Sequence, residues 1–231
     1  MSNSVPTVDQ IIAGFQHTKL TEITGKPSYT MLAKLKRELI TNVLAMHSNQ
    51  GGGSHGYRAI IVSDTEYALL VPTPFVTPKH PGAQPIIPMT TPSPTPGVIV
   101  QIVRKNTEEL HEYREHANIQ QAVTKQLVTA IDPLYLKAIQ HRDTGLSAIT
   151  SCTILDHLFT TYKAITVTKL DDNDVKMKQQ WDTTQPFETI IEQVEDACEY
   201  ATAGKQPYSD SQILNTAHRI FFQDWVVFQG L

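Results

Sequence analysis

The sequence predicts a mainly α-helical protein, in which a helix, a glycine-rich turn and an extended proline-rich linker precede a multi-helix bundle. Two observations lead to this expectation. Apolar residues recur at spacings of three and four along most of the chain, as they do on one face of an α-helix. Nine of the 14 prolines lie between Pro72 and Pro96. Because proline fixes φ and lacks a backbone donor, that segment is excluded from helices and interior strands.

The linker also separates two stretches of opposite charge. Residues 1–80 hold seven basic and five acidic side chains, whereas residues 98–231 hold twelve basic and eighteen acidic ones. A change of charge across a proline-rich segment is typical of a boundary between two units. The predicted organisation is a loosely ordered N-terminus (1–27), a helix-plus-turn unit (28–71), a proline-rich linker (72–97) and an all-helical domain (98–231).

In the helix-plus-turn unit, a helix is expected to start after Ser28 and to end near Ser48, before the glycines. Its apolar stripe is formed by Leu32, Leu35, Leu39, Val43 and Met46. The branched, apolar run 57–62 predicts a short strand. The capping-box pattern that begins at Ser63 predicts a short helix over 67–71.

The all-helical domain is expected to begin with one long helix over 98–131, which contains neither glycine nor proline. A short helix follows Asp132-Pro133, and a further apolar stripe runs through 149–162. The polar stretch 168–181 has Met177 and Trp181 among its apolar anchors. Two more helices are predicted, one from Pro186 to Gly204 and one after the capping box at Ser209.

Composition excludes several classes of protein. The 231 residues include only two cysteines, Cys152 and Cys198, too few for a disulfide framework or a four-thiolate zinc site. The net charge of −4 is unlike that of a protein that coats nucleic acid. The sequence has neither a membrane-length apolar run nor the pattern of a signal peptide. We therefore expect a cytoplasmic protein that has no membrane partner.

The segment 52–56 matches G-x-S-x-G, the nucleophile elbow of α/β-hydrolases, with Ser54 at the serine position. That motif needs a strand before it and a helix after it, and here the expected order is reversed. The preferred interpretation is a structural turn, in which glycines supply positive φ angles. Its residues are Gly51, Gly52, Gly53, His55 and Gly56. A serine hydrolase at Ser54 is kept as an alternative hypothesis.

No catalytic, cofactor-binding or metal-binding residue is predicted. His111 and His116 are five positions apart on a helix, so they diverge by roughly 140° and cannot share an ion. We expect them on a solvated helix surface. Cys152 and Cys198 lie within apolar stripes, where a small buried thiol fills the core. Trp181 is expected to have a structural role.

Three basic side chains on the first helix, Lys34, Lys36 and Arg37, are a candidate nucleic-acid contact. A solvated helix face is the more frequent meaning of such a group. An RNA-binding adaptor that uses this helix is therefore kept as an alternative function.

Two series of residues show a resemblance to a known family. The first contains Leu35-Lys-Arg-Glu-Leu39-x-x-Asn42, Gly51-Gly-Gly-Ser-His-Gly56, Tyr67, Phe75, Pro78 and His80-Pro-Gly82-x-x-Pro85. The second contains Leu155-x-x-Leu158-x-x-x-Tyr162-x-x-Ile165, Trp181-Asp182-x-x-Gln185-Pro186-x-Glu188, Glu199-Tyr200-Ala201 and Pro207-x-Ser209-Asp210. In this order and spacing they resemble the N-terminal part of Gag polyproteins of copia-type LTR retrotransposons, over about residues 28–230.

The resemblance implies a non-enzymatic structural protein that self-associates into a capsid-like particle. The bundle at 98–231 would then be the Gag-like domain, and the partners would be further copies of the chain and the RNA of the element. Such Gag proteins capture RNA through a cysteine/histidine knuckle, which this sequence lacks. We therefore expect a fragment or a truncated copy, with RNA captured through a segment that is absent here.

Overall fold

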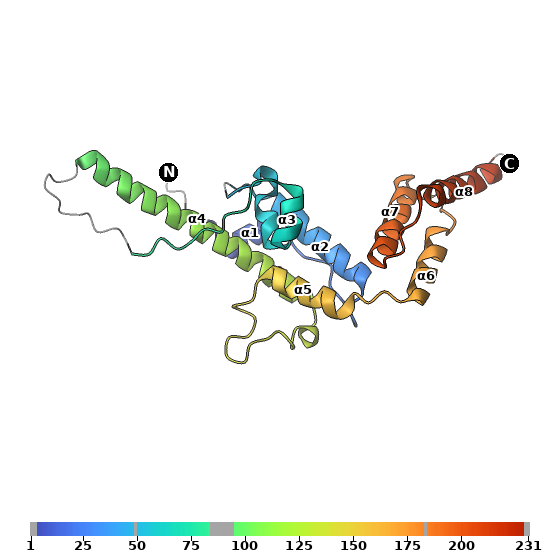
Figure 1. Cartoon of the computed structure of the whole chain (residues 1–231), viewed down its shortest axis with the longest axis horizontal. Helices are drawn as coiled ribbons and strands as arrows, with labels where there is room; N and C mark the ends of the chain where they lie inside the picture. Colours follow the sequence, from blue (N-terminus) through green and yellow to red (C-terminus); the bar gives the residue numbers. More distant parts are fainter. Residues whose placement is uncertain (1–3, 49, 84–94, 183, 229–231) are drawn as a thin grey trace. The chain divides into compact units, whose positions relative to one another are not determined.

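The structure, a computed structural model, describes residues 4–48, 50–83, 95–182 and 184–228, with the backbone alone for 222–228 (Figure 1). The predicted fold class is confirmed, because the described residues are mainly helical and form no β-strand. The helices are α1 (Val8–Gly14), α2 (Tyr29–Leu44), α3 (Asp64–Leu70), α4 (Pro96–Thr129), α5 (Ser151–Tyr162), α6 (Val167–Met177), α7 (Glu188–Ala203) and α8 (Asp210–Phe228), with short 3₁₀ helices η1 (Gly53–Ile60) and η2 (Pro133–Tyr135).

The chain divides into two compact units. Unit 1 comprises Met1–Pro27 and Met31–Thr161, and unit 2 comprises Ser28–Thr30 and Tyr162–Leu231. The sequence placed the division in the proline-rich segment 72–97, of which 84–94 lie outside the described residues. The structure places it near Thr161. The cause is local packing: the Val76 amide donates to the Gln50 carbonyl at 2.9 Å, and the His80 ring lies 5.0 Å from that of Tyr113.

The core of unit 1 is built from α2 and the C-terminal half of α4. The α2 stripe buries Leu32, Leu35, Leu39 and Val43 completely, as its spacing predicted. In α4 the completely buried side chains are Ile119, Ala122, Val123 and Leu127, all in its C-terminal half. The first half of this long helix buries no side chain before His116.

Buried polar side chains tie the N-terminal segment to this core. The amide oxygen of Asn42, which is 0% exposed, accepts from the His17 backbone amide at 2.7 Å. Its amide nitrogen donates to the His17 carbonyl and to Gln126 Oε1. Nearby, the Glu38 carboxylate accepts from the amide and hydroxyl of Thr21 at 2.8 and 2.6 Å. Each of these contacts satisfies a group that would be costly to bury alone.

The expectation of a loosely ordered N-terminus is therefore wrong. Residues 8–14 form α1, which begins with a capping box between Thr7 and Gln10. The segment also buries four apolar side chains, Ile11, Phe15, Leu20 and Ile23. They are too irregularly spaced to give one helical stripe, since only the first lies in α1. Their burial depends on the core that α2 and α4 supply.

The strand expected at 57–62 is also wrong, because most of that run belongs to η1. Tyr57 and Ile60 are buried three residues apart, which suits a 3₁₀ helix, where i and i+3 share a face. The helix expected after Ser63 is present as α3, and the Ser63 hydroxyl caps it by accepting from the Glu66 amide.

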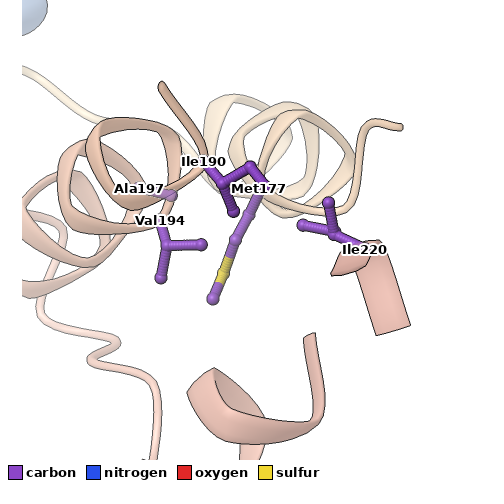
Figure 2. Close-up of a cluster of buried hydrophobic side chains, with 5 residues drawn as sticks. All are labelled: Met177, Ile190, Val194, Ala197 and Ile220. Atoms are coloured by element: carbon purple, nitrogen blue, oxygen red, sulfur yellow. The ribbon is translucent and has the colours of Figure 1, made fainter. Parts of the chain in front are cut away.

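Unit 2 consists mainly of α6, α7 and α8. Its core is a small cluster of Met177, Ile190, Val194, Ala197 and Ile220, and Figure 2 shows Met177 between side chains of α7 and α8. Trp181 packs against this cluster, and its indole N–H donates to the Thr189 hydroxyl at 3.1 Å. The capping box expected at Ser209 is confirmed, since Ser209 and Gln212 bond reciprocally.

Among the described residues, no helix is both long and apolar enough to cross a membrane.

Candidate functional site

The glycine-rich turn is a close-packed junction between η1, α3 and the segment after α3. Gly52 has φ of 63°, and a Cβ at this position would lie 2.0 Å from Tyr67 Oη. A Cβ at Gly51 would lie 2.5 Å from the Pro74 carbonyl oxygen, and one at Gly56 would lie 2.4 Å from Ser48 Cβ. The glycines thus allow Tyr67, Pro74 and Ser48 to approach the backbone. The structural role assigned to this turn agrees with these contacts.

The turn does not have the geometry of a serine nucleophile. Ser54 is exposed within η1, and no strand precedes it in the described part of the chain. The Nδ1 atom of the adjacent His55 is buried without a hydrogen-bond partner, as are Arg58 Nε and Tyr67 Oη. A nucleophilic serine needs a base within hydrogen-bond reach, itself oriented by a third group. Within the described residues, no hydrogen bond provides that relay for Ser54.

His116 does not lie on the solvated helix surface where the sequence placed it. It is only 9% exposed, and its ring stacks 5.8 Å from that of Phe75 and 6.4 Å from that of Tyr57. Burial lowers the pKa of His116 below its usual value, so the ring is neutral at pH 7. The sequence pattern missed this role because the covering residues Tyr57 and Phe75 come from a turn and a connecting segment.

The two cysteines are half-buried, and their thiols have raised pKa values. Burial raises the pKa of Cys152 to about 11, helped by Asp156, whose carboxylate accepts from the thiol at 3.7 Å. Burial, with a contribution from Glu195, also raises the pKa of Cys198. Both thiols therefore stay protonated at neutral pH, whereas a reactive cysteine is a thiolate.

The basic group on α2 is not one continuous surface. Lys36 is half-buried and forms an ion pair with Glu66 at 2.8 Å. Its ammonium also lies 5.9 Å from the centre of the Phe159 ring. Lys34 and Arg37 are exposed. Since Lys36 is already paired within unit 1, the group is a weaker candidate for phosphate contact than the sequence suggested.

Unit 2 has an exposed apolar groove between α7 and α8. It has a volume of about 440 Å³. The α7 side contributes Phe187 and Ile191, which are 48% and 46% exposed, and the α8 side contributes Phe221, which is 37% exposed. The rings of Phe187 and Phe221 contact edge to face at 5.8 Å. Beside the groove, Leu214 is 69% exposed on α8.

Two polar side chains border this groove. Glu195 of α7 and His218 of α8 both line it. The sequence carries a signal of this surface: Ile190 and Ile191 are adjacent, so they point about 100° apart on a helix. One of them is buried in the core, and the other is left at the surface.

The chain has no match among protein-family models, curated proteins or solved structures. Among the described residues, no group of three or more His, Cys, Asp and Glu side chains is placed to hold a metal ion.

Proposed function

We propose that the chain is a non-enzymatic, cytoplasmic structural protein that self-associates, in the manner of the capsid-like Gag proteins that its sequence resembles. The proposal rests mainly on one observation, the exposed apolar groove between α7 and α8. The sequence motifs that resemble those of Gag proteins also support the proposal, and the helical architecture is compatible with it.

The groove favours a protein partner because its side chains are large and apolar. Phe187 and Ile191 each leave about half of their surface in water. Burial of apolar surface contributes about 25 cal/mol per Å², so covering several such side chains favours association. A second copy of the chain carries the same apolar groove, so two copies can cover each other's exposed side chains in a two-fold interface.

The RNA-binding alternative has less support. It depends on Lys34, Lys36 and Arg37, and Lys36 is held by Glu66. Binding that falls steeply with salt and is lost when these three side chains are neutralised would favour it.

Sedimentation of the full chain from micromolar to millimolar concentration tests the proposal. We expect concentration-dependent oligomers, and we expect Ile191→Glu to weaken their formation by at least about tenfold, because it puts a charge into the apolar contact. Val175→Glu is the matched control, since Val175 is 70% exposed on α6 of the same unit and does not line the groove. It should associate like the native chain.

A native chain that stays monomeric up to millimolar concentration would overturn the proposal. Equal association of the Ile191→Glu and Val175→Glu variants would show that another surface is used.

A further inference from the structure

Unit 1 contains a cavity of about 560 Å³, formed by α3, the segment after it, α4 and the start of α5. Its size lies within the range of small-molecule sites, which are about 300–1,000 Å³. The wall combines apolar and aromatic side chains with a few polar ones, as such sites do. Its lining residues include Asp64, Tyr67, Ala68, Phe75, His116 and Gln120.

Three aromatic rings line the cavity, and the ring of Phe75 contacts the other two. Phe75 lies between the other two, with ring centres 6.3 Å from Tyr67 and 5.8 Å from His116. Tyr67 meets Phe75 edge to face, whereas the planes of Phe75 and His116 are tilted by 34°. The glycine turn fixes this arrangement, because it holds the Tyr67 hydroxyl against Gly52. Aromatic ring faces carry negative electrostatic potential and attract cations.

The charged groups at the cavity favour a positive ligand. Among the described residues that line the wall, Asp64 is the only Asp, Glu, Lys or Arg, and burial keeps His116 neutral at pH 7. The field at Cys152, which also lines the cavity, includes negative contributions from Asp156 and Asp64. Lys36 makes an opposing, positive contribution at Cys152, and its ammonium is paired with Glu66.

Two further polar features belong to this environment. Burial raises the pKa of Tyr57, whose ring contacts that of His116, and Glu115 and Glu112 of α4 raise this pKa further. Gln120 lies one turn after His116 on α4 and lines the same cavity, where its amide oxygen can accept a hydrogen bond. Arg58 of η1 is a nearby cation, but it is not part of the wall.

We propose that this cavity binds a small organic cation, a protonated amine carried on an apolar body. The ammonium group would face the Asp64 carboxylate, and the body would pack against Tyr67 and Phe75. This binding activity is separate from self-association, because the cavity lies in unit 1 and the apolar groove lies in unit 2.

Titration of the full chain with two matched probes, followed by amide NMR of residues 59–77, tests the proposal. Benzylamine is protonated at neutral pH, and benzyl alcohol is a neutral molecule of nearly the same shape. We expect benzylamine to bind roughly tenfold more tightly, because only the ammonium is attracted by the carboxylate and the rings.

Variants at exposed positions separate charge from shape. Asp64→Asn should reduce benzylamine binding to the level of the alcohol, whereas Asp143→Asn, an exposed carboxylate of unit 1 away from the wall, should leave it unchanged. Ala68→Phe should abolish binding of both probes by filling the cavity. Its control is Leu69→Phe, at a neighbouring position that is 85% exposed and outside the wall.

Equal affinity for the two probes, or full benzylamine binding by Asp64→Asn, would overturn the preference for a cation. Binding of neither probe at millimolar concentration, or unchanged binding by Ala68→Phe, would overturn the site itself.

Discussion

Unit 1 and unit 2 are both helical, but they differ in how completely they bury their apolar surface. In unit 1 the apolar stripe of α2 and that of the C-terminal half of α4 are completely buried, and Asn42, Gln126 and Glu38 anchor the N-terminal segment to them. In unit 2 the core is a cluster of five buried side chains (Figure 2). Apolar residues of α7 and α8 remain exposed beside that cluster.

This difference has a physical origin in the number of elements available. Small units bury a smaller fraction of their surface, so three helices leave apolar faces that a larger unit would cover. Unit 1 uses its N-terminal segment and the residues after α3 as additional cover. Unit 2 has no such cover among its described residues, so the groove between α7 and α8 stays exposed.

The largest expected effect is the loss of the anchor in unit 1. Asn42→Ala removes three hydrogen bonds. The His17 backbone amide and the side-chain oxygen Oε1 of Gln126 both lose Asn42 as a partner. We expect unit 1 to lose about 4 kcal/mol of unfolding free energy, since each buried unpaired group costs about 1–3 kcal/mol. Urea denaturation followed by far-UV circular dichroism measures this loss.

Thr41→Ala is the control, because its hydroxyl donates only to the preceding turn of α2, at the Arg37 carbonyl. A similar loss in both variants would mean that the polar network does not distinguish unit 1.

The second prediction concerns the small core of unit 2. Met177→Ala empties the centre of the cluster, where Met177 is 1% exposed, and should cost about 3 kcal/mol. Both tryptophans of the sequence, Trp181 and Trp225, belong to unit 2, so tryptophan fluorescence follows this unit during denaturation.

Val175→Ala, at a 70% exposed position of the same helix, should change stability by less than about 0.5 kcal/mol. If Met177→Ala were equally mild, the cluster would not be a cooperative core, and the two units would differ still more in how well their cores are packed.

The smallest expected effect is at the glycine turn. Gly52→Ala forces an alanine into a left-handed backbone and places its Cβ against the Tyr67 hydroxyl, so we expect a loss of about 2 kcal/mol. Gly53→Ala has a similar positive φ of 52° but open space around the added carbon, and should cost about 1 kcal/mol.

Thermal denaturation compares the two variants, and adding Tyr67→Phe to Gly52→Ala should restore part of the difference by removing the hydroxyl. Equal losses of stability in Gly52→Ala and Gly53→Ala would show that the Tyr67 side chain moves away from the added Cβ at little cost.

Much of the helical content could be predicted from the sequence because it is encoded locally. The stripe of α2, the long uninterrupted α4 and the capping residues Ser63 and Ser209 each act within a few positions of the chain. The errors concern residues whose environment comes from distant segments. Tyr57 is buried in a 3₁₀ helix instead of a strand, and His116 is covered by Phe75, which is 41 positions away.

From the sequence alone one can conclude that the chain is helical, where its glycine-rich turn lies and that the apolar stripe of α2 belongs to a core. These features follow from helix propensity, capping and hydrophobic periodicity, which act between residues close together in the chain. The tertiary structure alone decided that the N-terminal segment is anchored by Asn42, that the compact units divide near Thr161, and which apolar residues stay exposed. These features depend on which surfaces meet across the fold. A one-dimensional pattern shows that a residue is apolar, but burial depends on whether another element covers it.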